Sequence, residues 1–215
     1  MYSSNQELVF HIKQRSTSYL DSILRDQKVI DAMLRVDRSN FLPTTVKDYS
    51  YEDNPVPIGF GQTCSQPSMV AFVLDKLQIE RGNVILEIGA GCGYAAAIAS
   101  VLCGNEGLVY ASEIIPQLAE NARYNLAGFE NIKIISDDGS CGFKEYSPFD
   151  RIFISAGVSS SNFNSNILLS QLKNNGILIY PEAYGNIYKL KKIEDKIIKE
   201  VFYGVSFVPL RGKNT

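Results

Sequence analysis

The 215-residue chain is poor in several residue types on which common sites depend. It has one histidine, His11, no tryptophan, and nearly balanced charge, with 21 basic and 23 acidic residues. A single histidine excludes a three-histidine zinc centre. A net charge of −2 argues against a broad nucleic-acid surface, which needs a basic excess. We therefore expect neither a bound metal nor a nucleic-acid partner.

Cysteine and long apolar runs are also scarce. Cys64, Cys92, Cys103 and Cys141 form no Cys-x-x-Cys pair, which excludes zinc ribbons and thioredoxin-type motifs. The longest apolar stretch, Tyr94 to Cys103, is half of the roughly 20 residues that span a bilayer. The first residues have neither the basic start nor the apolar run of a signal peptide. These features predict reduced thiols in a cytoplasmic protein without membrane contact.

From residue 83 onward, apolar patterns predict alternating strands and helices. Strands are expected at 84–88, 108–112, 132–135, 151–155 and 176–180, and helices at 94–102, 116–127 and 167–172. Two further strands, 187–192 and 197–208, are joined by a short turn, which indicates an antiparallel hairpin. The alternation predicts an α/β fold, a Rossmann-like, doubly wound and mostly parallel sheet that ends in this hairpin.

The first 78 residues have a different pattern. Val29, Ile30, Met33 and Leu34 recur at helical spacing. Residues 43–65 are rich in proline, glycine and apolar side chains, which indicates an ordered loop, and a helix begins near residue 66. We expect one domain over residues 1–215, with 1–78 as an N-terminal helical cover and 79–215 as the sheet.

A glycine loop between the first strand and its helix is the clearest motif. Glu87-Ile88-Gly89-Ala90-Gly91-Cys92-Gly93 leads into a helix N-terminus with free N–H groups. Glu113 ends the next strand, where such folds hold ribose hydroxyls. The spacing is Gly-x-Gly-x-Gly, whereas nicotinamide dehydrogenases show Gly-x-Gly-x-x-Gly. A tight turn without a ligand is the alternative.

This loop resembles that of class I S-adenosylmethionine-dependent methyltransferases. The resemblance implies S-adenosyl-L-methionine as cofactor and S-adenosyl-L-homocysteine as product. Asp138-Gly139 follows the third strand, where that superfamily often holds adenine, although turn chemistry alone explains an aspartate there. The implied cofactor contacts in this part of the chain are Glu87, Gly89, Ala90, Gly91, Gly93, Glu113, Asp138 and Gly139.

Longer stretches resemble the protein-L-isoaspartate O-methyltransferase family. They include Met33-Leu34-x-Val36-x-Arg38-x-x-Phe41-Leu42-Pro43, Pro55-Val56-Pro57-Ile58-Gly59-x-Gly61-Gln62-Thr63-Cys64-Ser65-Gln66-Pro67-x-Met69 and Phe207-Val208-Pro209-Leu210. The resemblance implies methyl transfer to the free carboxylate of L-isoaspartyl residues in damaged proteins or peptides, a repair step. That carboxylate, with a pKa of about 4, is ionised at neutral pH. The reaction therefore needs alignment of the reacting groups and no general base.

The resemblance also implies roles outside the glycine loop. Ser65 is the active-site serine; Gln62, Thr63 and Cys64 lie beside the methionine end of the cofactor. Substrate contacts are implied at Pro57, Ile58, Gly59, Val208, Pro209 and Leu210. Capping of the next helix is an alternative for Ser65, and simple packing is an alternative for the aromatic residues of 51–60, which the resemblance places in the substrate channel.

Several positions depart from the family pattern. Cys64 and Cys92 replace an aliphatic residue and a serine, respectively, and residues 156–166 and 181–186 differ from the usual short turns. The segment after the fourth strand is expected at the substrate edge of the sheet, so these changes concern the acceptor more than the cofactor. A carboxylate methyltransferase with another peptide acceptor is therefore an alternative. A cofactor-binding module without activity is a second alternative, and a nicotinamide dehydrogenase is a distant one. We expect a monomer that acts on isoaspartyl peptides or proteins.

Overall fold

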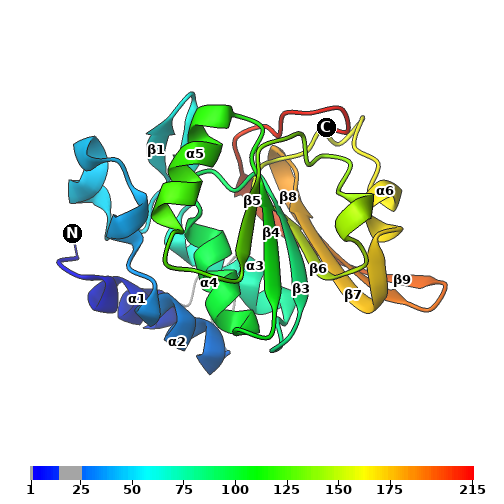
Figure 1. Cartoon of the computed structure of the whole chain (residues 1–215), viewed down its shortest axis with the longest axis horizontal. Helices are drawn as coiled ribbons and strands as arrows, with labels where there is room; N and C mark the ends of the chain where they lie inside the picture. Colours follow the sequence, from blue (N-terminus) through cyan, green and yellow to red (C-terminus); the bar gives the residue numbers. More distant parts are fainter. Residues whose placement is uncertain (1, 15–25) are drawn as a thin grey trace.

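A seven-stranded sheet runs through the molecule in the order β5-β4-β3-β6-β7-β8-β9 (Figure 1). The computed structural model describes residues 2–14 and 26–215. The strands are β3 (Val84–Ile88), β4 (Leu108–Ser112), β5 (Ile132–Ile135), β6 (Phe149–Ile154), β7 (Leu172–Pro181), β8 (Tyr184–Ile193) and β9 (Lys196–Ser206). The five strands from β5 to β7 in this order pair in parallel, and β7, β8 and β9 pair antiparallel. The predicted doubly wound, mostly parallel sheet with a C-terminal hairpin is confirmed.

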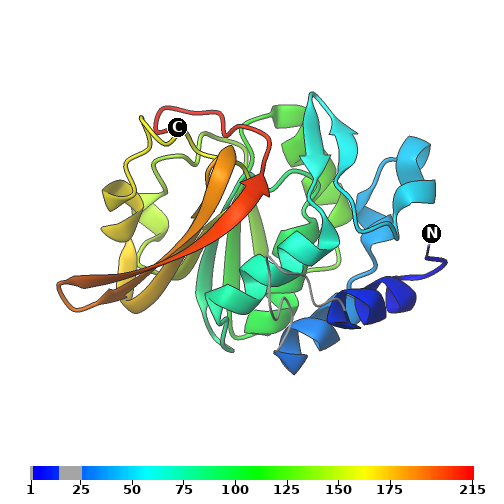
Figure 2. The same ribbon diagram turned by 180° about the vertical axis from the view of Figure 1, so that it is seen from behind.

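Helices lie on both sides of this sheet (Figures 1 and 2). One side carries α1 (Asn5–Gln14), α2 (Gln27–Arg35), α3 (Pro67–Leu77), α4 (Tyr94–Cys103) and α5 (Pro116–Asn125), and the other carries α6 (Asn166–Leu169). Helix α2 packs against α1, α3 and α4. Within the described residues, no helix has both the length and the apolar character to cross a membrane.

Strand β3 shows how the sheet separates two apolar cores. Ile85 belongs to the core that contains α3 and α4, whereas Leu86 and Ile88 belong to the core that contains α6. Successive side chains of a strand point to opposite faces. A strand covered on both faces therefore needs the continuous apolar run that the sequence shows.

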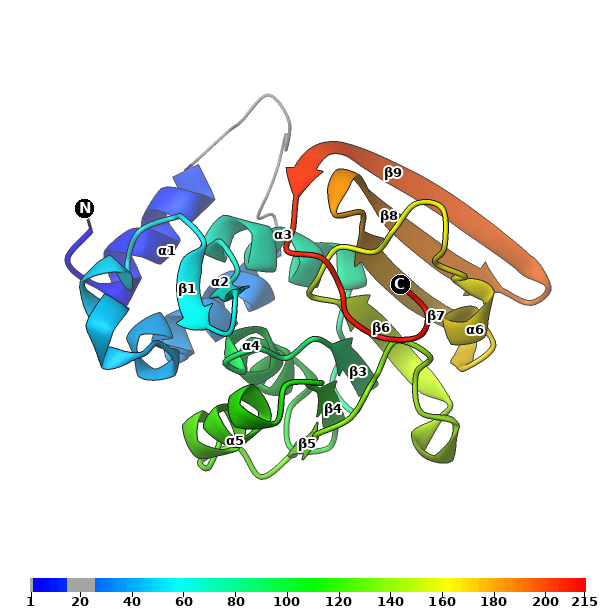
Figure 3. The same cartoon turned by 90° about the horizontal axis from the view of Figure 1, so that it is seen from above.

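The segment 43–65 is ordered, and its second half is a β-hairpin that the sequence analysis missed. Strand β1 (Val56–Gly59) pairs antiparallel with β2 (Gln62–Cys64), after a short 3₁₀ helix at Thr44–Tyr49. The prolines of this segment argue against strands. Both strands of an isolated two-stranded hairpin are edge strands, however, and edge strands tolerate proline. Pro57 is exposed there. The hairpin stands apart from the main sheet, above α4 (Figure 3).

Residues 207–215, here called the C-terminal strap, cross the carboxyl edge of the sheet (Figure 3). The N–H of Gly157 donates to Val208 O at 2.8 Å, and the N–H of Leu210 donates to Gly157 O at 2.7 Å. Further along, the N–H of Lys213 donates to Asp138 Oδ2 at 2.9 Å. The strap is thereby held over the ends of the strands that carry the site.

Candidate active site

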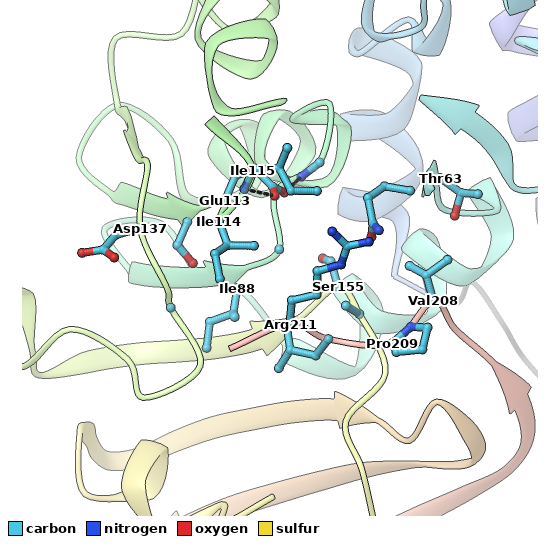
Figure 4. A pocket seen from close by; sticks show the side chains of 17 residues that line it. Thr63, Ile88, Glu113, Ile114, Ile115, Asp137, Ser155, Val208, Pro209 and Arg211 are labelled. Atoms are coloured by element: carbon cyan, nitrogen blue, oxygen red, sulfur yellow. Dashed lines mark hydrogen bonds between the residues drawn. The ribbon is translucent and has the colours of Figure 1, made fainter. Parts of the chain in front are cut away.

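A cleft lies at the carboxyl edge of the parallel strands (Figure 4). This edge is where doubly wound sheets bind their ligands. The lining residues that follow β3, β4, β5 and β6 include Gly89, Gly91, Glu113, Gly139 and Ser155. Residues that are far apart in sequence thus meet in one place because parallel strands end at the same edge.

The other wall of the cleft comes from the β-hairpin and the strap. Gln62 and Thr63 of β2 contribute to it, together with Val208, Pro209 and Leu210. In Figure 4, Thr63, Val208 and Pro209 lie across the cleft from Glu113 and Asp137. The cleft therefore separates the glycine-loop residues from the hairpin and the strap.

A second cavity adjoins this cleft and shares Thr63, Gly89, Gly91 and Ser155 with it. The further predicted site residues that line the second cavity are Cys64, Ser65, Glu87 and Ala90. Most of the residues expected at the site thus line one of two connected spaces.

The Glu113 carboxylate is buried and aligned by the backbone. Its Oε2 accepts a hydrogen bond from the N–H of Gly91 at 2.9 Å, and its Oε1 accepts one from the N–H of Ile115 at 2.9 Å (Figure 4). A carboxylate has about four acceptor positions. Two of them therefore stay available for hydroxyl donors of a ligand in the cleft.

Glu87 carries a buried acceptor without a partner. Its Oε1 accepts a hydrogen bond from the Ser155 hydroxyl at 2.7 Å, whereas its Oε2 has no partner among the described residues. Burial raises the pKa of Glu87 to about 8; the Ser155 hydrogen bond opposes this shift, and the nearby charges of Glu113 and Cys64 add to it. A buried acceptor of this kind fits a cationic donor. The amino group of S-adenosylmethionine supplies such a donor, so the residues present fit this cofactor.

Ser65 faces the second cavity at the end of the hairpin. No hydrogen bond joins its hydroxyl to another described residue, while its carbonyl accepts one from Arg38 Nη2 at 3.1 Å. The N-cap position of α3 is Gln66, and Asp53 Oδ1 accepts the hydrogen bond of the Ser68 N–H at 2.8 Å. The alternative in which Ser65 caps this helix is therefore wrong.

Arg38 is fully buried beneath the hairpin segment. Its guanidinium donates to the backbone carbonyls of Ser50, Glu52, Asn54, Cys64 and Ser65. A rigid fork of five N–H donors suits this task. Arg38 thus fixes the turn that presents Ser65, although the sequence marked it only as part of a motif.

Some of the predicted site residues lie outside both cavities. Asp138 Oδ1 accepts a hydrogen bond from the Ser140 N–H at 2.9 Å, and Oδ2 binds the strap. Partial burial opposes ionisation of Asp138, but these hydrogen bonds outweigh it and lower the pKa. Gly93 starts α4, where a Cβ atom would come within 2.7 Å of Leu126 Cδ1. The substrate residues Pro57, Ile58 and Gly59 lie in β1, outside the cavities, and their roles stay predictions.

Several residues that line the cleft were not predicted as site residues, and three of them carry polar or charged side chains that matter for the site: Ser155, Asp137 and Arg211. Ser155 and Asp137 directly follow β6 and β5, so their position at strand ends was an available signal. Arg211 follows the strap motif, and no sequence signal marks it. Among the described residues that line the cleft, Arg211 is the one cation, and its guanidinium reaches into the cleft in Figure 4.

Comparisons with known proteins agree with this geometry. The family model described as protein-L-isoaspartate(D-aspartate) O-methyltransferase matches residues 3–215. Relatives named protein-L-isoaspartate O-methyltransferase include one from Thermosipho melanesiensis, 44% identical over 86% of this chain and 94% of that protein. Another, from Methanococcoides burtonii, is 42% identical over 87% of this chain and 94% of that protein.

A solved structure from Plasmodium falciparum is similar over almost the whole chain. It is a candidate protein-L-isoaspartate O-methyltransferase in complex with S-adenosyl-L-homocysteine, 27% identical, with a TM-score of 0.83. The match covers 98% of this chain and 99% of that one. The chain belongs to the protein-L-isoaspartate (D-aspartate) O-methyltransferase family.

Proposed function

We propose that the protein transfers a methyl group from S-adenosylmethionine to the free carboxylate of L-isoaspartyl residues in damaged proteins or peptides, a repair reaction. The observation that carries this proposal is the meeting of the Ser65 hairpin and the glycine loop in one cavity. The glycine loop is common to methyltransferases, whereas the hairpin sequence is typical of this family. Its place beside the glycine loop supports isoaspartate as the acceptor.

The chain's own groups would hold the cofactor through polar contacts at the strand ends. Glu113 offers acceptor positions to ribose hydroxyls, and Glu87 offers its unpartnered oxygen to the amino group. Gln62, Thr63 and Cys64 lie on the facing hairpin, next to that end of the cavity. Backbone N–H groups of the glycine loop and the Asp138-Gly139 turn complete the proposed set. When bound, S-adenosylmethionine supplies a methyl group activated by its sulfonium.

The acceptor carboxylate would be oriented by Ser65. The Ser65 hydroxyl has no described partner, so it can donate to a carboxylate oxygen without breaking a hydrogen bond. Arg211 would attract the anionic substrate, and the strap residues Val208 to Leu210 would contact the peptide. The β1 segment Pro57 to Gly59 would contact it on the hairpin side.

Catalysis in this arrangement is alignment rather than proton transfer. The acceptor carboxylate is already anionic, and no side chain must remove a proton from it. Holding reacting atoms in line converts the encounter into a unimolecular step, which contributes several kcal/mol. The apolar Ile88, Val208 and Pro209 limit water around the reacting charges.

The segments that depart from the family pattern pack against each other. The N–H of Val158 donates to Pro181 O at 2.9 Å, and the N–H of Ala183 donates to Val158 O at 3.0 Å. A side chain on Gly157 would come within 2.3 Å of the Ala183 Cα atom. The two segments therefore pack as one unit. A different acceptor is not favoured.

The remaining features are proposals that the sequence supports. Residues 1–78 would cover a cofactor-binding sheet in 79–215 within a single domain. A monomeric state and a cytoplasmic location stay expectations.

A paired-peptide assay tests the proposed function. Purified protein is incubated with S-adenosylmethionine carrying a labelled methyl group and with either an isoaspartyl peptide or its aspartyl twin. We expect a base-labile methyl ester on the isoaspartyl peptide alone. Esters on another carboxylate and none on isoaspartate would select the alternative acceptor. Binding of S-adenosyl-L-homocysteine without any ester would indicate a binding module.

A further inference from the structure

Four residues of strand β7 bulge out of the sheet. Residues 173–176, here called the β7 bulge, lie between Leu172 and Ile177, which both pair with β6. The pairing of β7 with β8 starts only at Ile177. The β7 bulge therefore lies outside the register with either neighbouring strand, and it contains the one Asn-Gly pair of the chain, Asn175-Gly176.

The geometry of the β7 bulge requires this pair. Asn175 adopts a φ of 62°, a left-handed conformation that asparagine tolerates better than most residues. A Cβ atom at Gly176 would come within 2.8 Å of Lys173 O and 3.2 Å of Asp150 O, so only glycine fits there. The bulge thus places an unhindered main-chain nitrogen directly after an asparagine side chain.

Asn-Gly is the pair most prone to deamidation, because glycine has no side chain that hinders attack of its nitrogen on the asparagine amide. Asn175 is exposed, and no hydrogen bond joins its side chain to another described residue. Asn174 differs, because its Oδ1 accepts hydrogen bonds from the N–H of Asn175 at 3.0 Å and of Glu194 at 2.7 Å. Of these two adjacent asparagines, only Asn175 has a side chain that is free to react.

Asp138, which also precedes a glycine, is protected. Its carboxylate oxygens accept main-chain hydrogen bonds from Ser140 at 2.9 Å and from Lys213 at 2.9 Å. Partial burial opposes ionisation, but these hydrogen bonds lower the pKa of Asp138, and an ionised carboxylate reacts poorly with a nitrogen nucleophile. The β7 bulge is therefore the place where the folded chain is open to this reaction.

We propose that Asn175 is a deamidation site and that its isoaspartyl product is a substrate for a second copy of this enzyme. The Gly176 nitrogen attacks Asn175 Cγ, ammonia leaves with the proton of that nitrogen, and a succinimide ring forms. Water then adds to the main-chain carbonyl carbon of residue 175 and breaks its bond to the nitrogen. The α-carboxylate becomes free, and the chain now runs through Cγ.

The free α-carboxylate is the group that the proposed reaction esterifies. Its oxygen attacks the donor methyl group, the sulfur–carbon bond breaks, and S-adenosyl-L-homocysteine leaves. The Gly176 nitrogen then attacks the ester carbon, methanol leaves, and the succinimide forms again, so that water can open it to an ordinary aspartyl residue. Methylation at this position rests on the proposed function, whereas deamidation does not.

This methylation must occur between two molecules. Asn175 lies with Asn83 and Asp150 at the amino edge of the sheet, where β3 and β6 begin. Ser65 and the glycine loop line the cavity at the carboxyl edge, beyond the far end of β6. At about 3.3 Å per residue, the length of β6 separates the two places by roughly 15 Å or more. An exposed isoaspartyl residue at 175 can therefore enter only the cleft of another copy.

The test ages the purified protein without S-adenosylmethionine and follows residues 174–176 by peptide mass spectrometry. We expect the mass of an acid in place of an amide at Asn175, with isoaspartate as the major isomer, and unchanged Asn174 and Asp138. Asn175→Gly is the matched variant, because glycine adopts the left-handed conformation and has no amide. It should gain no acid at this position and should keep its activity on an isoaspartyl peptide.

Transfer between molecules is measured with aged Ser65→Ala protein as the acceptor and a labelled methyl donor. Label should appear at residue 175 when fresh unsubstituted protein is added, in proportion to the concentration of the fresh protein. Aged protein that carries both Ser65→Ala and Asn175→Gly should take up no label in this peptide.

An amide that persists at Asn175, while a free peptide of residues 170–180 deamidates, would overturn the deamidation site. Isoaspartate at this position that takes no label, from an enzyme that methylates a free isoaspartyl peptide, would overturn methylation by a second copy. If the free peptide is not methylated either, the proposed function fails and methylation by a second copy fails with it, while the mass measurement still decides deamidation.

Discussion

As a proposed cofactor contact, Glu87 is expected to make cofactor binding depend on pH through its single carboxyl group. With its pKa raised to about 8 by burial, Glu87 is protonated in the free protein below that pH. A cationic amino group beside it favours the carboxylate, so binding releases a proton below pH 8. Affinity for S-adenosyl-L-homocysteine should therefore rise with pH, by up to about tenfold per unit, and level off above pH 8.

Calorimetry at several pH values checks this expectation, with proton release read from buffers of different ionisation enthalpy. Glu87→Gln is the matched variant because it keeps the shape and cannot titrate. It should bind more weakly at pH 8 and show a flat profile between pH 6 and 8. The same slope in Glu87→Gln would assign the proton to another group.

Ser65 is expected to act on the acceptor rather than on the cofactor. Its hydroxyl is free to hydrogen-bond the substrate carboxylate, and such a charged hydrogen bond contributes about 1.5–3 kcal/mol. Ser65→Ala should therefore lower kcat/KM for an isoaspartyl peptide by roughly 10- to 100-fold with unchanged S-adenosyl-L-homocysteine affinity.

Ser170→Ala provides the control, since Ser170 is exposed at the end of α6 and its hydroxyl donates a hydrogen bond to Ile167 O. An unchanged kcat/KM in Ser65→Ala, or a parallel loss of cofactor affinity, would contradict the assigned role.

Much of the candidate site could be predicted at the residue scale, because a glycine loop and an acidic strand end are local patterns. Glu113 and Gly91 were expected near one another, and a hydrogen bond of 2.9 Å joins them. The partnership of Ser155 with Glu87 could not be predicted, since it joins two strands through side chains 68 positions apart. The place of Arg211 depends on the path of the strap, which sequence alone does not define.

A substitution at Arg38 tests what holds the segment around the β1–β2 hairpin in place. It is the shared donor for five carbonyls, and its removal would leave these buried acceptors without partners. Arg38→Ala should lower the free energy of unfolding by roughly 3–5 kcal/mol in denaturant titrations. Arg38→Lys keeps the charge without the fork and should lose part of this stability and part of kcat/KM.

The exposed Arg81, which forms a surface ion pair with Glu106 at 2.9 Å, is the matched control. Arg81→Ala should change stability by at most about 1 kcal/mol. An Arg38→Ala protein as stable as Arg81→Ala would show that the carbonyls do not depend on the guanidinium.

A substitution at Gly157, which follows β6, tests the contacts of this segment with the strap and with the turn after β7. A Cβ atom there would lie 2.3 Å from the Ala183 Cα, so the backbone must move. Gly157→Ala should destabilise the protein by about 1–3 kcal/mol and raise KM for the peptide, because Gly157 is hydrogen-bonded to the strap at Val208 and Leu210. Affinity for S-adenosyl-L-homocysteine should change little.

Gly128 is the matched control, because a Cβ atom at this position would meet no other atom within 4 Å. Gly128→Ala should therefore leave both the stability and the KM for the peptide nearly unchanged. Equal effects of the two substitutions on KM would show that the strap contact at Gly157 does not position the peptide.

At the scale of elements, the main sheet could be predicted because buried parallel strands are continuous apolar runs. The ends of some strands could not be predicted, because they depend on tertiary contacts. Strand β7 begins at Leu172 and runs through a polar Lys-Asn-Asn stretch in which Asn175 adopts a φ of 62°. Asparagine tolerates that conformation, so a strand can continue with an irregularity in register. The sequence predicted a helix as far as residue 172 and a strand only from residue 176, whereas the helix ends at Leu169.

The whole molecule brings a general methyltransferase sheet and a family-specific hairpin to one cavity. In the proposed function, the sheet and the β2 residues of the hairpin would supply groups for the cofactor, and Ser65, the β1 segment and the strap would supply groups for the acceptor. An isoaspartyl residue differs from an aspartyl residue by placing its free carboxylate on a shorter branch and lengthening the main chain. An enzyme that works by alignment must therefore distinguish the two strongly.

The ratio of kcat/KM for an isoaspartyl peptide to that for its aspartyl twin of the same sequence is the most direct test of the account. We predict methyl esters on the isoaspartyl peptide with a preference of at least ~100-fold. Equal rates on both peptides, or no ester on either from a protein that binds S-adenosyl-L-homocysteine, would contradict it.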